Sequence, residues 1–178
     1  ISACLVGSEM CIRDRSRRSG IRVHRRAVEY AGCVAVERVA SRTRPAMTRR
    51  GDWQARWGAY MRARADLPFA WGSNDCCLFA AGSVEALTGI ECASRFGRYD
   101  SAMGAARKVE QFGGLMGLAT AVLGPHCPPV MAAVGDVVLV ENAGRDLLGV
   151  CNGTSVLGPG ESGIFAVGMD AAKAAWKV

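Results

Sequence analysis

The order of hydrophobic and polar positions predicts a helical region followed by a region of short strands. Residues 52–64 carry apolar side chains at intervals of three and four, as on one face of an amphipathic helix: Trp53, Trp57, Tyr60 and Met61. Pro68 lies beyond this segment and excludes its continuation as a helix. A first helix is therefore expected over residues 52–64.

Three further helices are expected before the strands begin. Residues 75–89 have helical spacing through Leu78, Val84 and Leu87, with Ser73 or Asn74 as the expected N-cap and Gly89 as the stop. Residues 101–112 and 115–124 predict two shorter helices, which Gly113, Gly114 and Gly124 separate and end. Cys76 is therefore expected in the first turn of the second helix.

The pattern changes after the proline pair at 128–129. Residues 135–142, 147–153 and 162–168 are short, rich in Val and Ile, and bounded by Gly and Asn, as strands are. Residues 171–178 predict either a turn of helix or an edge strand ending on Trp176. Helices first and strands afterwards predict an α+β fold, with N-terminal helices packed on a small antiparallel sheet.

The basic charge of the chain is confined to residues 1–46. The formal charge is +6, and it arises in this segment, whereas residues 47–178 carry twelve basic and twelve acidic residues. Residues 1–18 resemble translated adapter sequence found at the ends of unrelated metagenomic reading frames. We therefore expect residues 1–46 to be a non-native leader, with Met47 as the start, rather than a targeting peptide or a nucleic-acid-binding arm. A domain at 47–178 without net charge predicts no nucleic-acid partner.

The cysteine spacing and the lengths of the apolar runs argue against a metal-binding protein and a membrane protein. Cysteines 4, 11 and 33 fall in the leader, and the other five, at 76, 77, 92, 127 and 151, lack paired metal-ligand spacing. We expect free thiols and neither a metal nor a cofactor. No apolar run reaches the roughly 18 residues that span a bilayer, and no signal peptide is recognised. A soluble domain without a membrane partner is expected.

Two short motifs carry a family resemblance. The string PFAWGSNDCCLFAA at 68–81 resembles the signature of NlpC-type, papain-like cysteine peptidases, and GDVVLV at 135–140 resembles the Gly-Asp strand that follows in that family. The resemblance implies a papain-like fold with Cys76 at the nucleophile position and Cys77 as the small residue after it. Asp75 would act at the helix end or orient the loop, and Phe69 and Trp71 would pack within the loop.

The physical argument for Cys76 stands beside the resemblance. The thiolate is the nucleophilic form of cysteine, and a free thiol with a pKa of about 8.5 is mostly protonated at neutral pH. The N–H groups and the positive dipole at a helix N-terminus favour an anion. The alternative is that both cysteines only pack as small apolar side chains, which we expect for Cys77.

The histidine base of this family is missing at its expected position. Alignment of Gly149 and Gly153 with the family pattern places Leu147 where the histidine would stand. His24 lies in the leader, and His126, in the loop before the Gly-Asp strand, is the remaining candidate base. Because Leu147 and Leu148 would form an apolar wall facing Cys76, we expect the pKa of Cys76 to lie near or above that of a free thiol. Cys76 should then react slowly with iodoacetamide at neutral pH.

The sequence also resembles a group of phage and prophage proteins encoded among tail genes. These proteins share two patterns: AWG followed by DCC and FAA, and GDVVLV followed by LGVC. This resemblance implies a tail-associated domain in the virion tail, or in the host cytoplasm during assembly, with tail proteins or the peptide stem of peptidoglycan as partners. One hypothesis is a degenerate peptidoglycan hydrolase that lacks the usual histidine. The other is a non-catalytic structural protein of tail assembly.

Overall fold

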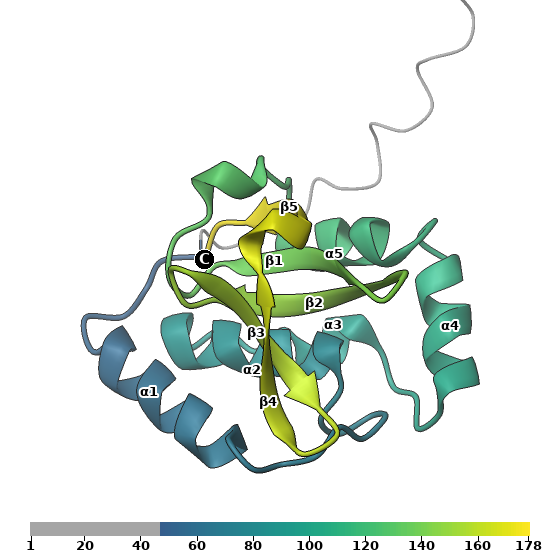
Figure 1. The fold of residues 1–178 in the computed structure, drawn as a ribbon, viewed down its shortest axis with the longest axis horizontal. Coiled ribbons are helices and arrows are strands. Elements are labelled where there is room, and N and C mark those ends of the chain that lie inside the picture. The colour runs from purple at the N-terminus through teal and green to yellow at the C-terminus, as the bar shows by residue number, and fades with distance from the viewer. Residues whose placement is uncertain (1–46) are drawn as a thin grey trace, which may run out of the picture. The chain divides into compact units, whose positions relative to one another are not determined.

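The computed structural model describes residues 47–178, which form five α-helices followed by five strands (Figure 1). The helices are α1 (Trp53–Arg64), α2 (Cys76–Thr88), α3 (Ala93–Phe96), α4 (Ala102–Glu110) and α5 (Leu115–Leu123). The strands are β1 (Val137–Asn142), β2 (Arg145–Cys151), β3 (Ser155–Gly160), β4 (Gly163–Gly168) and β5 (Ala172–Trp176). Short 3-10 turns, η1 (Pro129–Met131) and η2 (Met169–Ala171), precede β1 and β5. The predictions made for residues 1–46, including His24 and the leader cysteines, lie outside the described residues.

The five strands form one antiparallel sheet in the order β4-β3-β2-β1-β5. The predicted α+β class is therefore confirmed. The C-terminal segment forms the edge strand, which ends on Trp176, rather than a helix. Sequence patterning missed β3, whose residues 158–160 are Gly-Pro-Gly, and the single turn of α3.

The two faces of the sheet have different partners. On one face, Leu139 and Leu148 pair across β1 and β2 and pack with Trp176 against α2 and α5. The opposite face carries a smaller cluster built on Val138, Val140, Cys151 and Val156. The helix-facing side therefore holds the larger core and fixes α2 against β2.

The hairpin of β3 and β4 diverges from the rest of the sheet. β3 pairs with β2 only at Val150 and Cys151, whereas it pairs with β4 along its whole length. Figure 1 shows the hairpin running across α2, which β3 contacts. The N-terminal half of β2 is thus not covered by β3 and lies open beside the start of α2.

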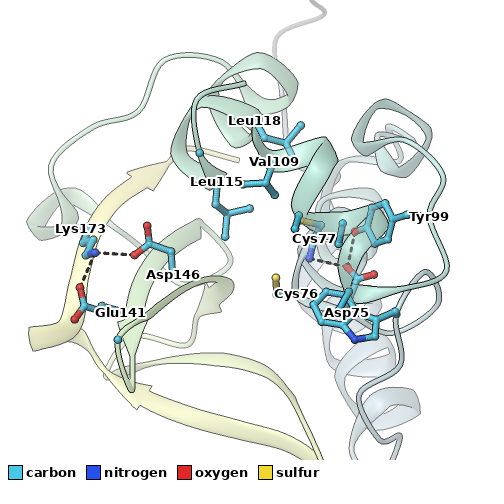
Figure 2. Close-up of a pocket in the computed structure, with 16 residues that line it drawn as sticks. Asp75, Cys76, Cys77, Tyr99, Val109, Leu115, Leu118, Glu141, Asp146 and Lys173 are labelled. Carbon is cyan, nitrogen blue, oxygen red and sulfur yellow. Dashed lines mark hydrogen bonds and ion pairs between the residues drawn. The ribbon is translucent and has the colours of Figure 1, made fainter. Parts of the chain in front are cut away.

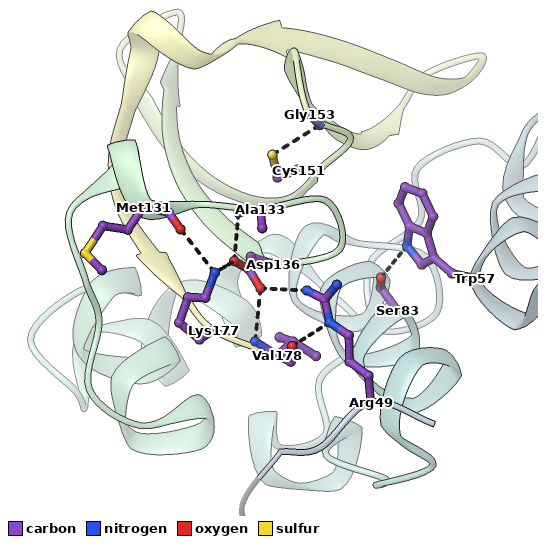
Figure 3. Close-up of polar contacts among 10 residues, drawn as sticks. All are labelled: Arg49, Trp57, Ser83, Met131, Ala133, Asp136, Cys151, Gly153, Lys177 and Val178. Carbon is purple, nitrogen blue, oxygen red and sulfur yellow. Dashed lines mark hydrogen bonds and ion pairs between the residues drawn. The ribbon is translucent and has the colours of Figure 1, made fainter. Parts of the chain in front are cut away.

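The aspartate of the Gly-Asp motif ties the ends of the domain together (Figure 3). Asp136 is fully buried, and its carboxylate accepts hydrogen bonds from Arg49 and Lys177 and from the N–H groups of Ala133 and Val178. Arg49 also donates to the Val178 carbonyl at 2.7 Å. Because Asp136 is held by these partners and lines none of the cavities described below, its role in this fold is structural.

Within residues 47–178, none of the helices combines the length and the apolar character needed to cross a membrane. In this same segment, 47–178, the cysteines at 76, 77, 92, 127 and 151 form no disulfide. The described residues contain no cluster of three or more His, Cys, Asp or Glu side chains suited to a metal ion.

Candidate active site around Cys76

The loop between α1 and α2 is shaped by Gly72 and Asn74. Gly72 has φ of 72°, and a Cβ atom there would collide with the carbonyl oxygen of Tyr99. Asn74 is buried; its amide donates to the Leu67 and Pro68 carbonyls, and its Oδ1 accepts from Arg64 at 2.7 Å. These contacts hold the loop in one shape at the start of α2.

Asp75 is the N-cap of α2, which corrects the predicted cap at Ser73 or Asn74. Its Oδ1 accepts hydrogen bonds from the N–H groups of Cys77 at 3.0 Å and Leu78 at 3.1 Å. Its Oδ2 accepts from the Gly72 N–H at 2.9 Å. Asn74 cannot cap because its side chain binds the loop carbonyls. Asp75 therefore both caps the helix and orients the loop, whereas the sequence predicted one or the other of these roles for this residue.

Cys76 is the first residue of α2 and lies where two cavities meet (Figure 2). One cavity, of about 510 Å³, extends between α2 and the α4–α5 region toward the charged end of the sheet. The other, of about 800 Å³, extends along the open half of β2 toward the β3–β4 hairpin. Both are lined by Trp71, Cys76 and Asp146. Cys76 is thus half-buried in a groove that continues on either side of it.

The two predicted loop aromatics also line this groove. Phe69 and Trp71 pack edge to face, with ring centroids 4.8 Å apart, as expected for loop packing. Both line the larger cavity, and Trp71 lines the smaller one as well, with 43% of its surface exposed. Trp71 therefore borders the space around Cys76 in addition to packing in the loop.

The strand opposite Cys76 presents the expected leucines and also a carboxylate: Cys76 packs against the buried cluster that contains Leu148, and Leu147 and Asp146 line the larger cavity with it. Asp146 pairs with Glu141 and Leu148 with Leu139, so both side chains share the helix-facing side of the sheet. Leu147 pairs with Val140 on the other face, although it also lines the larger cavity. The side chain of β2 common to both cavities is Asp146, one residue before the position that alignment indicated.

A charged cluster closes the end of the smaller cavity. Lys173 donates to Asp146 at 2.6 Å and to Glu141 at 2.7 Å. The Asp146 and Glu141 carboxylates raise the pKa of Lys173 above its ordinary value. The three side chains are about half exposed, so this cavity joins an apolar wall from α4 and α5 to a polar rim.

The prediction that Cys76 titrates near or above a free thiol is wrong in direction. The Cys77 thiol, by its hydrogen bond to Cys76, lowers the pKa of Cys76 most, and the N–H groups of Leu148 and Cys77 lower it further. Burial and the charge of Asp75 act in the opposite sense on this pKa. The expectation failed because it treated Cys77 only as a packing residue and considered the side chains of β2 but not its backbone N–H.

Cys77 and Tyr99 complete the surroundings of Cys76. Cys77 is buried, as predicted, but its hydrogen bond to Cys76 and burial raise its own pKa. The Tyr99 hydroxyl donates to Asp75 Oδ1 at 3.0 Å. Burial raises the pKa of Tyr99, so this hydroxyl stays protonated at neutral pH. Sequence patterning did not indicate Tyr99, which lies 24 positions from Asp75.

His126 does not lie at this site. Its ring is exposed and faces the edge of Trp176, with centroids 6.0 Å apart. It lines neither cavity that contains Cys76, and among the described residues no histidine does. The structure therefore brings Asp75 and Cys76 together and leaves His126 apart from them.

Comparison with known proteins places this site in a family without assigning its chemistry. No curated protein shows significant similarity to the chain. A family model described as a domain of unknown function, DUF6950, matches residues 48–178, which include every residue of the groove. The chain therefore belongs to the DUF6950 family.

Proposed function

We propose that this domain is a cysteine hydrolase with an NlpC-type, papain-like site that cleaves a peptide or amide bond. The observation that carries the proposal is the position of Cys76, the first residue of α2, at the junction of two cavities on a helix that packs against β2. A groove that continues on both sides of a thiol suits a chain cleaved at that point.

The chemistry requires few groups. The Cys76 thiolate attacks the substrate carbonyl carbon, and the Leu148 N–H near the sulfur is the donor that we assign to the developing oxyanion. The C–N bond then breaks, the amine leaves with a proton from solvent in the open groove, and a thioester remains on Cys76. Water hydrolyses the thioester to a carboxylic acid and the free thiol. Asp146, the carboxylate that lines both cavities, is the group we assign to accept a proton from this water.

We further propose that the substrate is the peptide stem of peptidoglycan and that the domain acts as part of a phage or prophage tail. The support is the order and spacing of the two motifs, at 68–81 and 135–140, together with an α+β fold that places Cys76 at the start of a helix packed on an antiparallel sheet. The tail setting accounts for a domain that meets a cell wall without any predicted membrane segment.

The test compares release of new amino groups from peptidoglycan fragments by the full chain and by Cys76→Ala. Cys127→Ala is the matched control, because Cys127 is also a half-buried free thiol but lines neither cavity. We expect release by the wild type and the control and a loss of at least a hundredfold in Cys76→Ala. Equal release by all three proteins would exclude a cysteine hydrolase.

A second candidate is a non-catalytic tail-assembly protein of the same fold. The observation that favours it is the lack of any imidazole among the described residues that line the groove. Under this reading the groove holds a segment of a tail protein, and Cys76→Ala leaves phage assembly intact. Loss of infectious particles with normal tails in Cys76→Ala would favour the hydrolase instead.

A further inference from the structure

The edge of β2 that faces away from β1 is open along its N-terminal half. Cys151 donates its N–H to the Asp136 carbonyl at 2.9 Å, so its backbone groups point to the side of β1. Neighbouring residues of a strand direct their N–H and C=O groups to opposite edges. Because the register with β1 is regular along β2, Val150, Leu148 and Asp146 direct these groups away from β1.

Pro159 of β3 explains why this edge stays open. Val150 pairs with Leu157, and the same register would place Pro159 across from Leu148. Proline has no N–H to donate to the Leu148 carbonyl, and the glycines on either side of Pro159 weaken a strand. Within residues 47–178, no strand pairs with this edge at Leu148 or Asp146.

The larger cavity, of about 800 Å³, lies along this open edge. Asp146 and Leu147 of β2 line it together with Pro159 and Phe165 of the hairpin, and Cys76 borders the same space. A purely apolar ligand would leave the N–H and C=O groups of the edge without partners, whereas an added strand pairs with them. The space therefore suits a peptide in extended conformation.

The charges of the groove favour a peptide with a basic side chain. Four carboxylates and two cations line the two cavities: Asp75, Glu141, Asp146, Glu161, Arg145 and Lys173. Lys173 binds both Glu141 and Asp146 and offsets only one of their two charges. The side chain of a residue paired with Asp146 would lie on the same face of the sheet as this carboxylate, where an opposite charge is favourable.

We propose that the groove binds an extended peptide that adds to the open edge of β2, antiparallel like the other strand pairs of this sheet, with a basic residue paired to Asp146. That residue exchanges two hydrogen bonds with the Asp146 N–H and carbonyl. The peptide carbonyl at the next pair then faces the Leu148 N–H, the donor assigned above to the oxyanion. The inference rests on the proposed function in taking the groove beside Cys76 as the place where the substrate binds.

The experiment titrates the full chain carrying Cys76→Ala, which removes the reactive thiol, with the peptide acetyl-Ala-Ala-Lys-Ala-Ala-amide and follows binding by NMR. Cys76→Ser is the second background if this variant fails to fold. The matched analogues carry one N-methyl group, on the lysine amide or on the amide of the alanine that follows it. We expect the first to bind about tenfold more weakly, because it cannot donate to the Asp146 carbonyl, and the second to stay within about twofold, because that amide points to the opposite edge. Norleucine in place of lysine should weaken binding about threefold by removing the charge.

Hydrogen exchange of the Asp146 amide gives a second readout, on the protein itself. We expect this exchange to slow about tenfold in the complex, with the Leu147 amide, which points toward β1, as the unchanged control. Equal binding of the two N-methyl peptides, unchanged exchange at Asp146, or no binding at millimolar peptide would overturn the strand addition, and equal binding of the norleucine peptide would overturn the basic residue. The hydrolase test is separate: strand addition in Cys76→Ala without release of amino groups by the wild type would exclude the hydrolase and keep the binding site.

Discussion

Asp75 and Asp136, the aspartates of the two sequence motifs, are equally buried but have different partners. Asp136 is 0% exposed and binds the cations Arg49 and Lys177 as well as two backbone N–H groups. Asp75 is 1% exposed and binds only neutral donors: three backbone N–H groups and the Tyr99 hydroxyl. One carboxylate is paired with two cations, and the other is held only by neutral donors beside Cys76.

The different partners of the two aspartates suit them to different roles: Asp136 stabilises the fold, and Asp75 influences the reactivity of Cys76. A buried carboxylate paired with cations holds segments that are far apart in sequence, here residue 49 and the C-terminus, and its loss leaves several groups without partners. A carboxylate held by neutral donors caps a helix and shapes a loop, and its charge acts on whatever lies next to it. Four predictions follow, starting with the largest effect: those on Asp136 and Asp75 test this separation, and the one on Tyr60 tests a contact that α1 makes with α2.

Asp136→Ala should give the largest loss of stability, about 3 kcal/mol, because it leaves the Ala133 and Val178 N–H groups and the Arg49 guanidinium without their acceptor. Urea denaturation of the full chain followed by tryptophan fluorescence measures it. Asp146→Ala, at an exposed position, is the control and should cost much less. A loss below 1 kcal/mol in Asp136→Ala would contradict the structural role of this residue.

Asp75→Ala should destabilise the protein by about 1–2 kcal/mol, the usual cost of removing an N-cap. Asp75→Asn should recover most of this loss, because an amide oxygen also accepts from the Cys77 and Leu78 N–H groups. The same denaturation experiment applies. If Asp75→Ala proved costlier than Asp136→Ala, the comparison between the two sites would be reversed.

Tyr60→Phe should cost about 1 kcal/mol at neutral pH, since the Tyr60 hydroxyl donates to the Phe79 carbonyl of α2 at 2.8 Å. Burial raises the pKa of Tyr60 from 10.0 to about 12. A raised folded-state pKa contributes stability that is present below pH 10 and is lost as the pH rises through about 12. The difference in free energy of unfolding between wild type and Tyr60→Phe, measured by urea denaturation, should therefore be smaller at pH 11 than at pH 9. A constant difference would show that this hydroxyl does not titrate with unfolding.

Asp75→Asn should speed the alkylation of Cys76 at neutral pH by about twofold to threefold, the smallest effect of the four. The Asp75 charge raises the pKa of Cys76, and the amide removes that charge while it keeps the cap. Rates measured at 0.1 and 1 M salt sharpen the test, because screening reduces the difference only if its origin is electrostatic. Slower alkylation in Asp75→Asn would mean that the carboxylate assists Cys76 by positioning Tyr99.

Local patterning predicted the elements that bring Cys76 into the groove. The periodic apolar positions gave α2 and its end at Gly89, which has the expected left-handed conformation with φ of 78°. The N-cap was missed by one or two positions because residues 73–75 are all of capping type, and long-range contacts of Asn74 select among them. Strand β3 was missed because Gly and Pro disfavour strands, and its pairing with β4 compensates for them.

The features that decide the chemistry of the site depend on tertiary contacts. Neighbouring residues of a strand lie on opposite faces of the sheet. The alignment of β2 with the family pattern drew attention to Leu147, so it overlooked Asp146 on the helix-facing side. Tyr99 reaches Asp75 from a loop with no helical or strand pattern of its own. The backbone N–H of Leu148 has no sequence signature at all, because every residue except proline carries one.

The contact of Arg49 with Val178 brings the two ends of the described segment together. Arg49 Nε lies 2.7 Å from the Val178 carbonyl oxygen, so the chain enters and leaves the fold at one place. A module with adjacent ends can be inserted into a surface loop of a larger protein without stretching either partner. Such an insertion would attach the domain to its host through one region, where Asp136 binds both Arg49 and Val178.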